Sequence, residues 1–126
     1  MKAYTDLEQS KKLAEFLPLE SADMWYWEFP TAPTYNGYGY PMFHKGEDIR
    51  NVPCWSLAAL LNYLREIDFF PEIEADEHGV TMSINYYDEE EARLLAPVHN
   101  IKVKAESFID ACVEMILKLK ENNNLL

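Results

Sequence analysis

The sequence predicts an α+β protein: an antiparallel sheet of three to five strands, two apolar helices packed on one face of it, and an amphipathic N-terminal helix. Two observations support this prediction. The last helical segment, Ser107 to Glu121, has one narrow polar stripe, so most of its surface must be covered. The segment Val80 to Tyr87 alternates apolar and polar residues, which is typical of a half-buried antiparallel strand.

Each of the other two long helices begins or ends at a recognisable signal. The N-terminal helix is expected from about Asp6 to Leu17, because Thr5 and Glu8 have the spacing of a capping box and Pro18 follows. The second helix is expected from Pro53, in its first turn, to about Ile67. It is nearly as apolar as the last helix, so the two should pack together on the sheet.

Two more strands are expected beside Val80–Tyr87. Residues Glu72 to Asp76 alternate in the same way, and a turn ending at Gly79 would join them to it as a hairpin. Residues Ile101 to Lys104 form the third strand. A short helix is expected after Asp88, where acidic residues favour a helix start.

A further pair of strands is expected in the N-terminal half, Met24 to Phe29 and a short return strand Tyr38 to Phe43, separated by the Asn36–Gly37 turn. No repeat and no long linker divides the chain. A single domain spanning residues 1–126 is therefore predicted.

Composition limits the compartment and the partners. Hydrophobic residues make up 48% of the chain, yet no apolar run is long enough to span a membrane and the N-terminus lacks a signal-peptide core. We therefore expect a cytoplasmic protein without membrane association. Cys54 and Cys112 fit a reducing compartment and are expected to be buried thiols on helices.

The net charge of −11 is unevenly distributed. Between Asp68 and Glu91 the chain has acidic residues but no lysine or arginine. Such a surface repels phosphate backbones, so direct nucleic-acid binding is not expected.

The motifs of catalysis and metal binding are weak. His44, His78 and His99 fall in predicted loops without the spacing of metal ligands, so we expect no metal and no cofactor. Cys54 or Ser56, at a helix start, would be the candidate nucleophile, but no nucleophile elbow surrounds them. No catalytic residue is assigned.

Two stretches are candidate binding surfaces. The aromatic stretch between Met24 and Phe43 is either a core strand with a loop packed on it or a partner or ligand surface, because tyrosine and tryptophan are enriched at interfaces. Its candidate residues are Trp25, Trp27, Tyr35, Tyr38 and Tyr40. The second stretch is acidic and is either a solvated face or a contact surface, in one version a decoy that imitates phosphate charge. Its candidate residues are Glu72, Glu74, Asp88, Glu89, Glu90 and Glu91.

Three blocks carry a resemblance: Leu17 to Trp25, Pro53 to Leu61, and Asp110 to Leu119. In these blocks the chain resembles small uncharacterised proteins of gut Bacteroides-type bacteria and of their phages and mobile elements. The resemblance implies no activity and no site residue. It implies an accessory protein that acts by contact rather than by chemistry.

The sequence therefore favours a small acidic cytoplasmic protein-interaction module, in one version of phage or mobile-element origin. Its protein partner is not identified, and a homodimer is left open. The alternative is a small enzyme or ligand-binding protein with its site in the aromatic stretch Trp25–Phe43.

Overall fold

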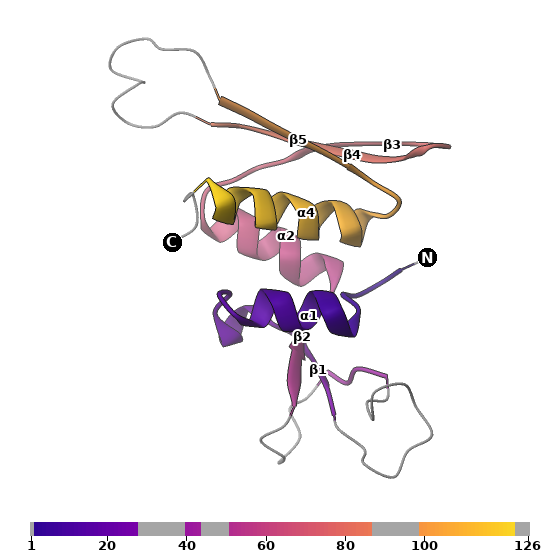
Figure 1. Ribbon diagram of the computed structural model, residues 1–126, viewed down its shortest axis with the longest axis vertical. Helices are drawn as coiled ribbons and strands as arrows, with labels where there is room; N and C mark the ends of the chain where they lie inside the picture. The colour runs from indigo at the N-terminus through magenta and orange to yellow at the C-terminus, as the bar shows by residue number, and fades with distance from the viewer. Residues whose placement is uncertain (1, 28–39, 44–50, 87–98, 123–126) are drawn as a thin grey trace. The chain divides into compact units, whose positions relative to one another are not determined.

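The fold is α+β, as predicted, in a computed structural model that describes residues 2–27, 40–43, 51–86 and 99–122. The chain divides into two compact units, Met1–Leu61 and Asn62–Leu126. The division falls within a helix, and the single domain stays a prediction. Figure 1 shows the elements of each unit.

Helix α1, Leu7–Ala14, is the amphipathic N-terminal helix, with Leu13 and Ser10 buried. Its capping box is one residue later than predicted. Asp6 caps the helix by accepting a hydrogen bond from the Gln9 backbone N–H at 2.8 Å, and the Gln9 side chain accepts one from the Asp6 N–H at 3.1 Å. The predicted cap, Thr5, is instead buried and bonded to other parts of the unit.

Strands β1, Met24–Tyr26, and β2, Val52–Cys54, form a two-stranded antiparallel sheet. The prediction that Pro53 opens a helix is wrong, because Pro53 lies in β2 opposite Trp25. Proline lacks a backbone donor and is tolerated in a strand that is not bonded on both sides. The predicted return strand is present among the described residues only as a single bridge between Trp25 and Met42.

Helix α2, Leu57–Glu66, begins four residues after Pro53, where the sequence predicts its first turn. Ser56 is its N-cap: the Ser56 Oγ accepts a hydrogen bond from the Ala59 N–H at 3.2 Å. Asp23 fixes this cap, since its carboxylate accepts hydrogen bonds from both the Ser56 N–H, at 2.9 Å, and the Ser56 hydroxyl.

The C-terminus of α2 is closed by a Schellman motif without glycine. The Phe69 N–H donates to the Leu64 carbonyl at 2.9 Å, and the Asp68 N–H donates to the Arg65 carbonyl at 3.0 Å. Asp68 has φ 64° and is the one non-glycine residue with positive φ in the described chain. A left-handed conformation is costly for a residue with a Cβ, although aspartate tolerates it better than most.

The second sheet consists of β3, Glu72–Asp76, β4, Gly79–Tyr86, and β5, His99–Ala105, in the antiparallel order β3-β4-β5. It lies within the predicted range of three to five strands. Met82 and Ile84 are buried and Thr81 and Ser83 are half-buried, so the predicted register of β4 is confirmed.

The predicted β3–β4 turn is confirmed, and Gly79 explains why it is tight. Gly79 has φ +139°, and a Cβ on it would lie 2.6 Å from the Ala105 carbonyl oxygen. Only glycine accepts that backbone and that approach together.

Helix α4, Phe108–Glu121, packs against β4 and β5 (Figure 1). Ser107 caps it as predicted, accepting a hydrogen bond from the Asp110 N–H at 3.1 Å. The polar stripe is exposed at Glu114, Lys118 and Glu121. The buried residues of the helix are Ile109, Ala111, Cys112, Val113, Met115, Ile116 and Leu119. No helix in the described ranges has the length and apolar character needed to cross a membrane.

Replacing Asp68 with glycine should stabilise the protein by about 0.5–1 kcal/mol, because glycine relieves the left-handed strain at a moderate entropic cost. Asp68→Ala is the matched control and should not stabilise, since alanine keeps the Cβ. Urea unfolding monitored by circular dichroism measures both. A less stable Asp68→Gly variant would contradict the strained cap.

Replacing Ile116 with alanine should destabilise the protein by about 2–5 kcal/mol, since this side chain is fully buried in α4. The sequence predicts the same burial for Leu61, but the structure leaves Leu61 half-buried. Leu61→Ala should therefore cost clearly less in the same denaturant titration. Equal losses for the two variants would argue against this difference in burial.

Candidate functional site

The outer edge of the three-stranded sheet is formed by an exposed strand. Strand β3 bonds to β4 on one side, and within the described ranges no strand lies on its other side. All five residues of β3 are exposed, including Ile73 with 36% of its surface. We call the side of Glu72–Asp76 that points away from β4 the β3 edge.

The register places the β3 side chains on two different faces. Ile73 lies opposite Met82 and Ala75 opposite Val80, so both apolar residues share the face that α4 covers further along the sheet. Helix α4 packs against β4 and β5, which leaves Ile73 partly exposed at the border of that cover. Just before the strand, Phe70 is 68% exposed.

The opposite face is polar and carries charges in columns. Glu72 lies opposite Ser83, which in turn lies opposite Lys102 on β5. In the next row, Glu74 lies opposite Thr81, which lies opposite Lys104. Neighbouring strands lie about 4.8 Å apart, so the backbones that carry the acidic column of β3 and the lysine column of β5 are roughly 10 Å apart, and no ion pair joins the two columns within the described residues.

The structure describes only two of the six residues of the predicted acidic face. Glu72 and Glu74 share the polar face of the sheet, whereas Asp88, Glu89, Glu90 and Glu91 lie outside the described residues. Lys102 and Lys104 are exposed on that same face and lie within about a screening length of the acids. Their charge weakens the hypothesis of a phosphate-like decoy, and the acidic face as a site stays a prediction.

The aromatic stretch is divided between a half-buried part and an exposed part. Trp25 is half-buried in β1, and its N–H and carbonyl bond to Met42 at 2.7 and 2.8 Å. Trp27 is also half-buried. Tyr40 is 84% exposed and Phe43 is 74% exposed. The other two candidates, Tyr35 and Tyr38, lie outside the described residues.

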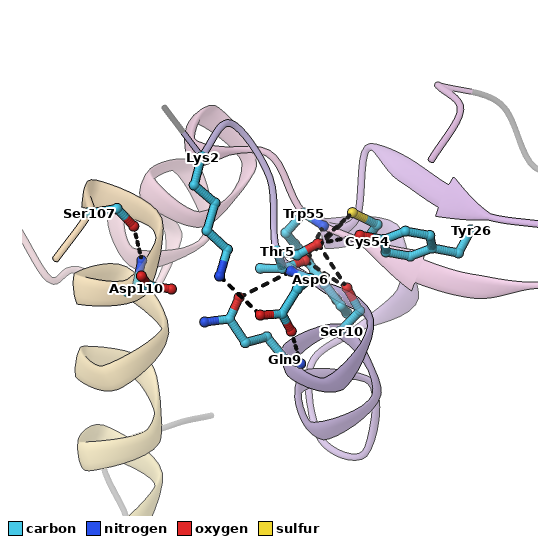
Figure 2. Close-up of polar contacts among 10 residues, drawn as sticks. All are labelled: Lys2, Thr5, Asp6, Gln9, Ser10, Tyr26, Cys54, Trp55, Ser107 and Asp110. Carbon is cyan, nitrogen blue, oxygen red and sulfur yellow. Dashed lines mark hydrogen bonds and ion pairs between the residues drawn. The ribbon is translucent and has the colours of Figure 1, made fainter. Parts of the chain in front are cut away.

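A buried polar cluster in the N-terminal unit was not predicted from the sequence. It surrounds Thr5, and Figure 2 shows Ser10, Tyr26, Cys54 and Trp55 around this residue. The Thr5 hydroxyl lies 2.7 Å from the Ser10 hydroxyl and accepts a hydrogen bond from the Trp55 N–H at 3.1 Å. The Thr5 carbonyl accepts bonds from the Tyr26 hydroxyl at 2.8 Å and from the Cys54 Sγ at 3.4 Å.

The geometry of this Thr5 cluster points to a structural role. Cys54 lies on β2 rather than at a helix start, which corrects the sequence prediction, so no helix N-terminus lowers its pKa. Burial raises the pKa of the Cys54 thiol, although hydrogen bonds from Thr5 and Ser10 oppose the shift. Burial also raises the pKa of Tyr26 well above its ordinary value. Protonated, buried groups of this kind are poor nucleophiles and bases.

The cluster left one weak signal in the sequence. Ser10 occupies a position three residues from Leu7 and three from Leu13, on the apolar side of α1, where a hydroxyl needs a buried partner. The partners Tyr26 and Cys54 are far away in the sequence, so nothing could identify them before folding.

The remaining candidates for chemistry are not brought together. Cys112 is buried in α4, as a small hydrophobic residue would be, and burial raises its pKa to about 12. His78 lies in the exposed β3–β4 turn, 3.5 Å from the Glu77 carboxylate. In the part of the chain that the structure describes, no group of three or more His, Cys, Asp or Glu residues is placed to hold a metal ion.

Comparisons of the chain with protein families, with curated proteins and with solved structures found no match. The resemblance to small proteins of Bacteroides-type bacteria and their mobile elements therefore stays a prediction.

Replacing Thr5 with valine should destabilise the protein by about 1–3 kcal/mol, because it removes the acceptor of the buried Trp55 N–H and the partner of Ser10. Thr81→Val, on the half-buried polar face of β4, should change stability by no more than about 0.5 kcal/mol. Thr5→Ser should recover most of the loss, since it restores the hydroxyl. Thermal unfolding compares the three variants. If Thr5→Val and Thr81→Val behave alike, the cluster contributes nothing to stability.

Proposed function

We propose that this protein is a protein-interaction module that binds an extended segment of a partner protein along the β3 edge. The partner segment would add a fourth strand to the sheet. The observation that supports this proposal is an edge strand whose five residues are all exposed. Such an edge offers unpaired N–H and C=O groups to an incoming strand, and strand addition uses them for affinity.

Among the described residues, the edge lacks several devices that prevent strand addition. Natural edge strands are commonly protected by proline, lysine, bulges or a covering element. Residues Glu72–Asp76 contain no proline or lysine, and their register with β4 is unbroken. The protective features that are present are the acidic side chains of β3 and Pro71, which directly precedes the strand.

The side chains around the edge also favour an added strand. Ile73 and Ala75 are apolar and exposed on the face that α4 covers further along the sheet. Opposite residues of paired strands have Cβ atoms about 4.5–5.5 Å apart, so apolar side chains of the partner would pack beside them. The added strand would thus cover Ile73 as well as the backbone.

The backbone groups available to the partner follow from the hairpin. Asp76 and Gly79 flank a two-residue turn as the closing pair of β3 and β4. In an antiparallel pair, alternate residues point their backbone groups toward the partner and away from it. We therefore expect Ile73 and Ala75 to point their N–H and C=O outward.

The alternative, an enzyme or ligand-binding protein with its site in the aromatic stretch, gains no specific support from the described residues. Trp25 bonds within a small sheet, and Tyr40 and Phe43 are individually exposed. The thiol within this sheet, Cys54 on β2, is buried.

Ala75→Pro tests the proposal, because proline removes one outward donor and obstructs an incoming strand while being tolerated at an edge. The probes are fluorescent seven-residue peptides in which valine alternates with lysine, with threonine or with glutamate. At least one should bind the natural protein saturably in fluorescence anisotropy, and Ala75→Pro should weaken it about tenfold or more.

Ala75→Val is the matched control, since it keeps the N–H and suits a strand. It should bind as the natural protein does, and both variants should unfold at temperatures near that of the natural protein. In NMR titrations the amide signals of Ile73 and Ala75 should shift. Binding of none of the peptides, or binding that Ala75→Pro leaves unchanged, would overturn the proposal.

A further inference from the structure

We infer that the segment bound at the β3 edge is basic at alternate residues and apolar between them, and that it belongs to another protein rather than to a second copy of this chain. The inference rests on the proposed function and specifies its partner. The β3 edge can pair with an added strand, and the charges around the edge determine which side chains that strand should carry.

On the polar face, an added strand would lie next to Glu72 and Glu74. Both are exposed, and neither forms an ion pair within the described part of the chain. The lysines of β5 on this face are two strand spacings away, whereas the side chains of an added strand would be one spacing away. Lysine or arginine at these positions would make the cross-strand pairs that stabilise a sheet.

On the other face, the same strand would lie next to Ile73 and Ala75. Successive residues of a strand point to opposite faces, so a residue between two basic ones must be apolar to cover Ile73. Strand β5 shows that this sheet accepts such a pattern: Lys102 and Lys104 are exposed on the polar face, while Ile101 and Val103 are buried.

A second copy is a poor occupant through its own β3. Antiparallel pairing of two β3 strands centred on Glu74 would place Glu74 opposite Glu74 and Glu72 opposite Asp76. Like charges directly opposite one another destabilise a strand pair. The acidic residues thus act against self-pairing while they favour a basic segment.

Strand β5 of a second copy has the right charge but the wrong symmetry. Pairing β3 of one copy with β5 of the next uses two different surfaces, and such contacts continue into rings or open filaments. A basic segment of another protein would pair with the same acidic residues and with the outward backbone groups of β3 without continuing into a filament. We therefore assign the edge to a separate basic, extended segment.

The test uses the full chain and the three labelled peptides, in which valine alternates with lysine, with threonine or with glutamate. At low ionic strength the lysine peptide should bind more tightly than the threonine peptide by about 2- to 30-fold, the range expected for two cross-strand charge pairs. The glutamate peptide should bind most weakly. Added salt should narrow these differences, because it screens exposed charges.

The double variant Glu72→Lys/Glu74→Lys should reverse the order and bind the glutamate peptide best. The control Glu114→Lys/Glu121→Lys changes the net charge equally but alters exposed positions of α4. It should keep the preference for the lysine peptide. If both double variants lose the preference alike, net charge rather than the β3 edge selects the peptide, and the inference is wrong.

The two proposals fail in different ways. If the threonine peptide binds as tightly as the lysine peptide and Ala75→Pro abolishes both, strand addition holds and the basic specificity is refuted. Sedimentation velocity tests whether a second copy binds at the edge. The natural protein should remain monomeric at the concentrations used for binding. A larger species that Ala75→Pro dissociates would show that a second copy occupies the edge and would overturn the inference.

Discussion

The burial of one face of β4 and β5 under α4 determines which side chains of the three-stranded sheet face the helix. Helix α4 has a single narrow polar stripe, so it must be covered over most of its surface, and the apolar face of the sheet covers one side of it. Once Met82 and Ile84 are buried, the period of two sets every other side chain of β4. The register of the paired strands then determines which side chains of β3 and β5 lie on each face.

This constraint also creates the candidate surface. Because the helix packs against β4 and β5, strand β3 extends to the border of its cover with Ile73 and Ala75 on the apolar face. The opposite face must then carry Glu72 and Glu74, one strand spacing away from any strand added at the edge. Apolar and acidic side chains therefore flank the same strand edge, and the proposed basic, extended partner is inferred from this combination.

The N-terminal unit is organised by a different means. Met24, Tyr26 and Cys54 form one apolar cluster of this unit, and buried hydrogen bonds connect the segments around it. Thr5 bonds to Trp55 through both backbone and side chain, and Asp23 fixes the start of α2 through Ser56. Such contacts join residues that are distant in the sequence, and each leaves a buried polar group unsatisfied if one partner is lost.

The sequence by itself determined the fold class, the β3–β4 hairpin, the register of β4 and the cap and polar stripe of α4, because these depend on periodicity and on residues within one turn of each other. Only the tertiary structure placed Pro53 and Cys54 in a strand, since the pairing with β1 overrides the local helix signal of a proline. It alone decided that Thr5 bonds to Trp55 and Cys54 instead of capping α1. It also decided that Ile73 remains exposed, because alternation shows which residues share a face but the extent of a helix decides which of them it covers.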